Sequence, residues 1–167
     1  MKTVLLVRHA KSSWDNITLN DSDRPLNDRG KKNAPEMAER LLARNISIDS
    51  FISSPAKRAR KTAEIFSKTY KKNKDKILII PDLYGATPEA FENAIAAAPS
   101  NASSIAIFSH NPGITDFVNT LTEVRIDNMP TCSVFAVKTH IDRWEKFREA
   151  SKEFYFFDYP KNKESDD

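Results

Sequence analysis

Hydrophobic residues along this chain fall into two patterns. Short apolar runs rich in β-branched residues indicate strands, and apolar positions spaced three or four apart indicate helices. The run at 4–7 contains no polar residue, which is typical of a strand buried on both faces. The same criteria predict strands at 4–7, 50–53, 77–80, 104–108, 133–137 and 154–157. They predict helices at 30–44, 56–70, 88–98 and 113–121, and leave 143–149 open between strand and helix.

The order of these elements predicts the fold class. Strands alternate with helices, which favours an α/β fold: a three-layer sandwich with a mostly parallel central sheet and helices on both faces. No internal repeat or linker interrupts residues 1–160, so we expect one domain there. The polar tail at 161–167 is expected to be disordered. Residues 10–28 form a polar loop of a length that is typical of functional segments.

Composition narrows the class of protein. The chain has 167 residues, of which 40% are hydrophobic and 29% charged, a globular profile. Its net charge of +3 permits an anionic ligand without indicating nucleic acid. No apolar run approaches the roughly 20 residues that span a bilayer. The single cysteine, Cys132, precludes an internal disulfide and is expected to be a buried structural thiol. We therefore expect a cytoplasmic protein without a membrane anchor.

Candidate chemistry lies where the predicted strands end. Ligands of open α/β sheets bind at the carboxyl ends of the strands. Arg8 and His9 follow the first strand, and His110 follows the strand at 104–108. Arg58 lies one turn into the helix that follows the second strand. We expect these four side chains to converge at one edge of the sheet.

Together these side chains suit phosphoryl chemistry. The planar arginine fork binds phosphoryl oxygens in pairs. An imidazole beside such a cradle can attack phosphorus, and a second imidazole can stabilise the charge of the transition state. This chemistry requires no metal and no cofactor. Each residue alone also has an ordinary structural explanation, so the hypothesis depends on their joint placement.

Four segments resemble the histidine phosphatase superfamily. They lie in the order of that family and occupy residues 6–14, 24–30, 53–63 and 107–112. The short chain and the sequence Arg8-His9-Ala10-Lys11 resemble its SixA-like phosphohistidine phosphatase branch. The resemblance implies a phosphoglycerate mutase-like fold and phosphatase activity.

The resemblance also implies a role for each matching residue. His9 corresponds to the phosphoryl acceptor, Arg8 and Arg58 to phosphate ligands, and His110 to the residue that completes the pocket. It further suggests a substrate-binding set made of Arg24, Ser12 and Asn111.

The chain departs from the family pattern at three points. Ala10 replaces the glycine of the signature, and Asp15 stands where mutases have a substrate-binding asparagine. A carboxylate repels phosphate, so we expect Asp15 to point elsewhere or to pair with a base. The general acid is not evident, and Asp82 and Glu89 are the nearest candidates for an acid or base, although either can equally be a surface carboxylate.

The missing acid bears on the substrate. An alkoxide leaving group needs a proton at the moment of cleavage, whereas a phosphorylated imidazole leaves more readily. We therefore expect a substrate with a P–N bond, carried by a phosphorylated protein (phosphohistidine) or a small phosphorylated molecule. The alternatives are a small-molecule phosphomonoesterase of the same fold and a non-catalytic module that binds phosphorylated ligands.

A basic stretch of the sequence raises the question of a further binding partner. Residues 57–76 contain nine Lys or Arg and two acids, a pattern that a solvated helix face explains. It also suits attraction of an acidic protein or a phosphorylated ligand. Nucleic-acid binding rests on this stretch alone, so we expect no nucleic-acid partner.

Overall fold

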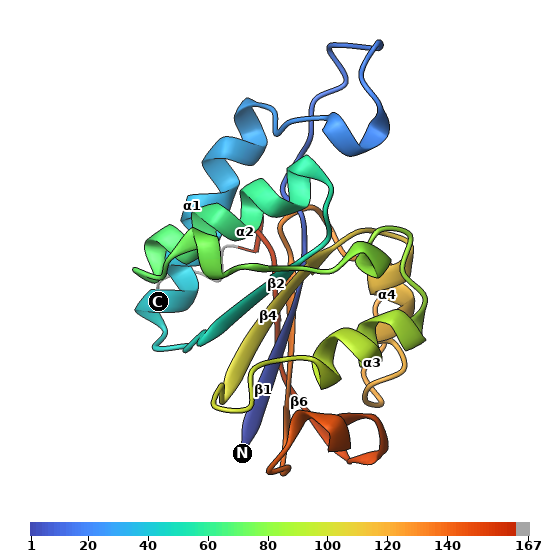
Figure 1. The fold of residues 1–167 in the computed structure, drawn as a ribbon. Coiled ribbons are helices and arrows are strands. Elements are labelled where there is room, and N and C mark those ends of the chain that lie inside the picture. Colours follow the sequence, from blue (N-terminus) through green and yellow to red (C-terminus); the bar gives the residue numbers. More distant parts are fainter. Residues whose placement is uncertain (163–167) are drawn as a thin grey trace.

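The computed structural model describes residues 1–162 and contains one mixed sheet of six strands in the order β3-β2-β4-β1-β5-β6 (Figure 1). The strands β3, β2, β4 and β1 pair in parallel, and β5 is antiparallel to both β1 and β6. The strand bounds are β1 (Lys2–Arg8), β2 (Ser50–Ser53), β3 (Leu78–Ile79), β4 (Ser104–Ser109), β5 (Val134–Thr139) and β6 (Lys152–Asp158).

Helices cover both faces of this sheet (Figure 1). The α-helices are α1 (Asp28–Ala43), α2 (Lys57–Thr69), α3 (Pro88–Ala96) and α4 (Gly113–Val118). The connecting segments contain four short 3-10 helices: η1 (Asp21–Asp23), η2 (Lys74–Lys76), η3 (Pro81–Leu83) and η4 (Trp144–Glu149).

The strands divide their apolar side chains between two cores because successive side chains point to opposite faces. In β1, Leu5 and Val7 belong to the core that α1 and α2 cover. Val4 and Leu6 belong to the core that α3 and α4 cover. The three-layer α/β sandwich with a mostly parallel sheet is thus confirmed. Cys132 is fully buried as expected, and burial raises the pKa of its thiol to about 12.

Several element boundaries differ from the sequence prediction for local reasons. Helix α1 begins at Asp28, two residues early, because the Asn27 side chain accepts a hydrogen bond from the Gly30 backbone N–H at 2.9 Å and caps it. The undecided segment 143–149 contains the 3-10 helix η4, and the expected strand at 77–80 shortens to two residues at the sheet edge. Of the tail expected to be disordered, residues 163–167 lie outside the described residues.

The parallel strands place their carboxyl ends level with one another. Arg8 of β1 pairs with Ser109 of β4, and Ser53 of β2 pairs with Phe108 of β4. The loop 10–28 rises from this edge and is joined across its base by a bridge between Ser12 and Leu26 (Figure 1). Within residues 1–162, no helix has the length and apolarity needed to cross a membrane.

Candidate active site

The register of β1 and β4 brings the two candidate histidines together. Because Arg8 lies opposite Ser109, the next residues, His9 and His110, leave adjacent strands side by side. Their ring centroids are 5.1 Å apart. Both side chains are largely buried, so their polar atoms face the protein and a small pocket rather than open solvent.

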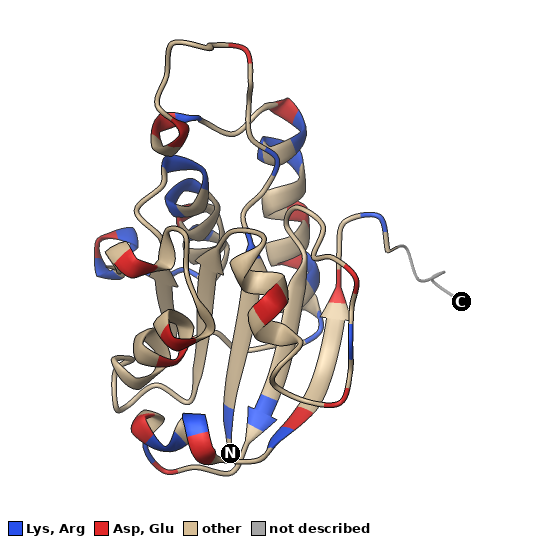
Figure 2. Ribbon diagram, turned by 90° about the vertical axis from the view of Figure 1, so that its right-hand side faces the viewer, with Lys and Arg blue, Asp and Glu red and all other residues tan. Residues whose placement is uncertain are grey.

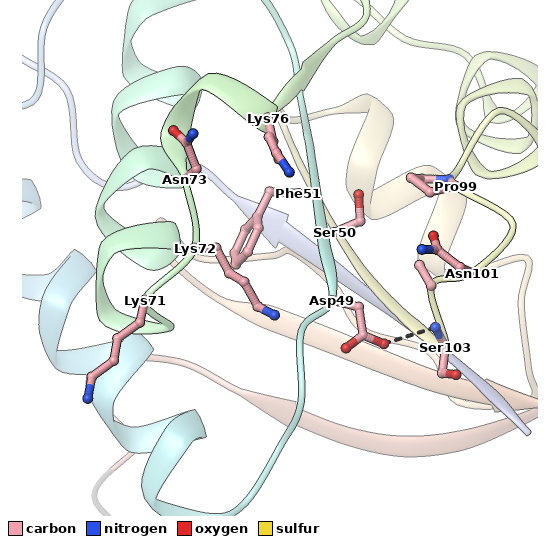
Figure 3. Close-up of a pocket in the computed structure, with 11 residues that line it drawn as sticks. Asp49, Ser50, Phe51, Lys71, Lys72, Asn73, Lys76, Pro99, Asn101 and Ser103 are labelled. Atoms are coloured by element: carbon pink, nitrogen blue, oxygen red, sulfur yellow. Dashed lines mark hydrogen bonds between the residues drawn. The ribbon is translucent and has the colours of Figure 1, made fainter.

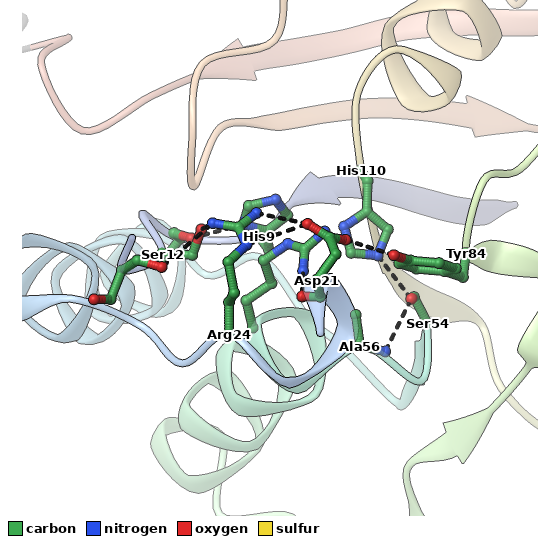
Figure 4. A network of polar contacts seen from close by, with 11 residues as sticks. His9, Ser12, Asp21, Arg24, Ser54, Ala56, Tyr84 and His110 are labelled. Carbon is green, nitrogen blue, oxygen red and sulfur yellow. Dashed lines mark hydrogen bonds and ion pairs between the residues drawn. The ribbon is translucent and has the colours of Figure 1, made fainter. Parts of the chain in front are cut away.

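This pocket has a volume of about 340 Å³. It brings together all seven residues predicted to be catalytic or substrate-binding: Arg8, His9, Ser12, Arg24, Arg58, His110 and Asn111. Four further residues line it that the sequence did not single out: Lys11, Trp14, Asp21 and Thr131. Figure 4 shows the polar network that connects many of these side chains.

His9 presents an unprotonated nitrogen to the pocket. Its Nδ1 lies 2.7 Å from the Ala10 carbonyl oxygen, and since a carbonyl only accepts, Nδ1 carries the proton. Nε2 therefore holds a free lone pair. Burial lowers the pKa of His9 to about 3, helped by the positive charges of Arg58 and Arg8. The ring is consequently neutral at neutral pH and able to act as a nucleophile.

Two arginines line the pocket, the half-buried Arg8 and the buried Arg58. Arg8 donates through Nη1 to the Met129 carbonyl at 2.8 Å. Arg58 donates through Nη1 and Nη2 to the Asp21 carbonyl and carboxylate, at 2.6 and 2.9 Å. The Nε of each arginine is buried and has no partner among the described residues. Both arginine side chains line the pocket, and an unsatisfied buried donor is costly, so these guanidinium groups favour an acceptor nearby.

His110 completes this arrangement from β4. Its Nε2 lies 2.7 Å from the Ser54 hydroxyl, which also accepts a hydrogen bond from the Ala56 backbone N–H (Figure 4). Its Nδ1 is buried without a partner among residues 1–162. Burial, followed by the charge of Arg58, lowers the pKa of His110 to about 4. The ring is therefore also neutral and offers one more polar atom to a ligand.

Among the four pocket residues that the sequence did not single out, Asp21 makes the most charged contacts. Its carboxylate accepts from Arg24 Nε and Nη2 at 3.1 Å, from Arg58 Nη2, and from the Tyr84 hydroxyl (Figure 4). The hydrogen bond from Tyr84, followed by those from Arg58 and Arg24, holds the pKa of Asp21 well below its usual range. No local pattern distinguishes this acid from the other acids of its polar loop.

The three candidate substrate-binding residues are held by protein groups. Arg24 donates to the Ser12 hydroxyl at 2.7 Å, and its guanidinium lies 3.5 Å from the centre of the Trp14 ring. Asn111 donates to the Met129 carbonyl at 3.1 Å. In this structure these contacts shape the wall of the pocket.

Thr62 ties helix α2 to the end of β1. Its hydroxyl donates to the Arg58 carbonyl one turn earlier, at 2.7 Å, and accepts from the Ala10 backbone N–H at 3.0 Å. The side chain thus links the residue after His9 to the turn that carries Arg58. This contact gives a physical reason for the Arg and Thr spacing in segment 53–63.

The candidate acid or base residues do not line the pocket. Asp82 and Glu89 are exposed and absent from its lining, so their role stays a prediction. Asp15 is exposed and likewise outside the lining, in keeping with the expected repulsion of phosphate. Within residues 1–162, no three His, Cys, Asp or Glu side chains are grouped so that they could hold a metal ion.

His9 and His110 thus follow the carboxyl ends of β1 and β4, Arg8 is the last residue of β1, and Arg58 lies in the first turn of α2. The family model described as the histidine phosphatase superfamily, branch 1, matches residues 4–84. This match spans just under half of the chain and includes Arg8, His9 and Arg58, and the similarity supports a phosphatase.

Solved structures share the fold along nearly the whole chain. The protein histidine phosphatase SixA complexed with tungstate superposes with a TM-score of 0.80 and 22% identity, covering 96% of this chain and 98% of that one. A structure from Agrobacterium tumefaciens, assigned by inference as the phosphohistidine phosphatase SixA, superposes with a TM-score of 0.77 and 24% identity. The superposition covers 95% of this chain and 98% of that one. An uncharacterized chloroplastic protein of Arabidopsis thaliana is 28% identical over 153 residues, which are 87% of this chain and 70% of that protein.

Proposed function

We propose that the protein is a metal-independent phosphohistidine phosphatase that forms a phosphohistidine intermediate on His9. One observation carries the proposal: a neutral imidazole shares its pocket with three buried polar atoms that lack partners among the described residues. These atoms are Arg8 Nε, Arg58 Nε and His110 Nδ1. They match the needs of a phosphoryl group, whose oxygens accept hydrogen bonds from several directions.

In the first step, His9 Nε2 attacks phosphorus and the bond from phosphorus to the leaving group breaks. Arg8 and Arg58 donate to the phosphoryl oxygens as their charge redistributes. When the Ser54 hydroxyl donates a hydrogen bond to His110 Nε2, the ring proton is on Nδ1, which then adds a third donor. The Ala10 carbonyl holds the Nδ1 proton of His9 and stabilises the positive charge that develops on this ring.

In the second step, water attacks phosphorus and the bond to His9 Nε2 breaks. The imidazole returns to its neutral form with its Nδ1 proton still bonded to the Ala10 carbonyl. The water proton leaves with the phosphate or to solvent. A phosphohistidine substrate protonated on its other ring nitrogen departs as neutral imidazole in the first step, so this substrate needs no acid from the protein.

Exposed apolar side chains beside the pocket support a protein substrate. Trp14, which lines the pocket, is 69% exposed, and Ile17 further along the same loop is 93% exposed. Exposed apolar groups around a polar site are typical of surfaces that contact another protein. The buried Cys132 thiol is consistent with a cytoplasmic, reducing location.

The test is to trap the intermediate. The protein is reacted with a small phosphoramidate or an activated aryl phosphate, quenched in base and analysed by mass spectrometry. We expect phosphate on His9, and none in His9→Ala. His140→Ala is the matched control because His140 is exposed and lies outside the pocket lining.

Substrate preference is tested with the same protein. We expect phosphohistidine peptides to be turned over at least about tenfold faster than alkyl phosphate monoesters, which need a proton on the leaving oxygen. Equal rates would favour the alternative of a small-molecule phosphomonoesterase. Turnover that survives in His9→Ala would contradict the covalent mechanism.

A further inference from the structure

A second cavity lies at the opposite end of the sheet from the catalytic pocket. It has a volume of about 760 Å³ and opens where β2 begins, between the turn after α2 and the loop that precedes β4 (Figure 3). Polar side chains from all three segments line it: Ser50, Lys72, Asn73, Lys76, Asn101 and Ser103. Nothing in the proposed phosphatase chemistry uses this cavity.

The cavity carries uncompensated positive charge. Figure 3 shows the ammonium groups of Lys72 and Lys76 directed toward the hollow, and neither forms an ion pair within residues 1–162. The one carboxylate in the lining, Asp49, accepts backbone hydrogen bonds from Ser103 and Ser104 at 2.9 and 3.0 Å. Both bonds reach Oδ2 of Asp49, and the three lysines of the lining, Lys71, Lys72 and Lys76, outnumber this single carboxylate, so the cavity keeps a net positive charge for an anionic ligand.

The positive surface continues along helix α2. Lys72 and Asn73 also line an adjoining hollow of about 480 Å³, together with Lys61, Lys68, Lys74 and one acid, Glu64, which pairs with Lys61 at 3.8 Å. Lys61, Lys68 and Lys72 are seven and four positions apart, which places them along one side of the helix and its end. Figure 2 shows that charged residues gather on the helices, turns and strand ends. We call the surface formed by Lys61, Lys68, Lys72, Lys74 and Lys76 the basic groove.

Helix α2 connects this groove to the catalytic pocket. Arg58, in its first turn, lines the pocket, and the basic groove begins at Lys61 and continues past its last turn. At 1.5 Å per residue, the 13 residues of α2 span about 20 Å. An extended peptide covers that distance with about six residues. One partner segment can therefore reach both sites.

We infer that the basic groove binds an extended, acidic peptide segment of a protein partner. Charge complementarity supports a chain of Asp and Glu residues, and the side-chain amides of Asn73 and Asn101 can pair with a peptide backbone. A nucleic acid fits less well, because the aromatic residue in the lining, Phe51, is only 4% exposed and cannot stack on a base. This part of the inference rests on the proposed function: the same partner carries its phosphorylated residue about six positions from the acidic segment, the number of extended residues that spans helix α2.

Binding is tested first, without any turnover. A fluorescent hexaglutamate peptide is titrated with the whole protein and followed by anisotropy, with a six-nucleotide single strand in parallel. We expect peptide binding that weakens with salt, and about a tenfold loss of affinity in Lys72→Ala/Lys76→Ala. Lys138→Ala/Lys146→Ala is the matched control, because it removes the same charge from residues outside the groove.

Each other outcome overturns the inference. An equal loss in the control variant would mean that net charge alone attracts the peptide. Unchanged binding in Lys72→Ala/Lys76→Ala would place the peptide elsewhere. Tighter binding of the oligonucleotide than of the peptide at the same salt concentration would identify a nucleic-acid surface instead.

Turnover is tested separately, so that failure of the groove and of the proposed function are distinguishable. For a phosphohistidine peptide with Glu residues about six positions away, Lys72→Ala/Lys76→Ala should raise KM about tenfold and leave kcat unchanged. Its turnover of a small aryl phosphate should equal that of the wild type. Wild-type protein that binds hexaglutamate but hydrolyses neither substrate would contradict the proposed function alone.

Discussion

At the scale of single residues, Asp21 sets the state of the phosphate cradle. The two terminal nitrogens of Arg58 donate to Asp21, one to its carbonyl and one to its carboxylate. An incoming phosphoryl group meets an arginine whose fork already holds an anion. Under the proposed function, we therefore expect Asp21 to oppose phosphate binding through its charge and through its two hydrogen bonds with Arg58.

The substitution Asp21→Asn should consequently raise the affinity for inorganic phosphate about tenfold. Like charges a few ångströms apart repel, and because the carboxylate is about half exposed this repulsion is reduced by solvent. Calorimetric titration with phosphate measures the change. Asp23→Asn is the control, since Asp23 is exposed, lies in the same turn and does not line the pocket. Weaker binding in Asp21→Asn would instead show that Asp21 positions Arg58.

At the scale of elements, the first turn of α1 packs against the segment that follows His9. The Asn27 backbone N–H donates to the Lys11 carbonyl at 3.0 Å. Gly30 approaches so closely that a Cβ built on it would lie 2.2 Å from the same carbonyl oxygen. Only glycine lets the helix lie this near the strand end, so the helix start and the segment after His9 pack as one unit.

The substitution Gly30→Ala should destabilise the protein by roughly 2–4 kcal/mol, as overpacking of a rigid contact does. In an unconstrained helix the same change usually stabilises, so the sign is diagnostic. Urea unfolding followed by circular dichroism measures the free energy. Lys31→Ala, at the next and exposed position, should change it by less than about 0.5 kcal/mol. A neutral or stabilising Gly30→Ala would show that the backbone yields at this contact.

At the scale of the whole molecule, the buried histidines couple folding to pH. The folded pKa values of His9 and His110 are lowered to about 3 and about 4, below the unfolded value near 6.5. The unfolded chain therefore binds more protons in acid. Their contribution to stability is complete above pH 6.5 and is lost as the pH falls toward the folded values.

Between pH 6.5 and pH 4, each histidine should lower the free energy of unfolding by roughly 2–3 kcal/mol. Urea titrations across this range, in buffers without phosphate, measure the slope. His9→Gln should remove about half of it, whereas His140→Gln should leave it unchanged because His140 is exposed. A profile for His9→Gln that matches the wild type would mean that folding does not lower the pKa of His9.

Local sequence already predicted much of this architecture and the members of the candidate site. Apolar runs such as 4–7 and 105–108 marked the central strands, because a strand covered on both faces buries successive side chains in apolar surroundings. Arg8, His9, Arg58 and His110 were predictable because they follow such runs or lie within recognisable segments. The pocket lining now brings them together, while their catalytic roles remain proposals.

Tertiary structure alone decided the contacts that bind distant parts of the chain. Asp21 meets Arg58 and Tyr84 across 37 and 63 positions, so no local pattern could identify it. The sheet order, the antiparallel β5 and the second cavity likewise depend on how separate segments pack. The sequence by itself determined which elements form and which side chains follow them, because both depend on near neighbours. Only the tertiary structure decided which charged side chains share a pocket, because residues far apart in the sequence meet only when the segments between them have folded.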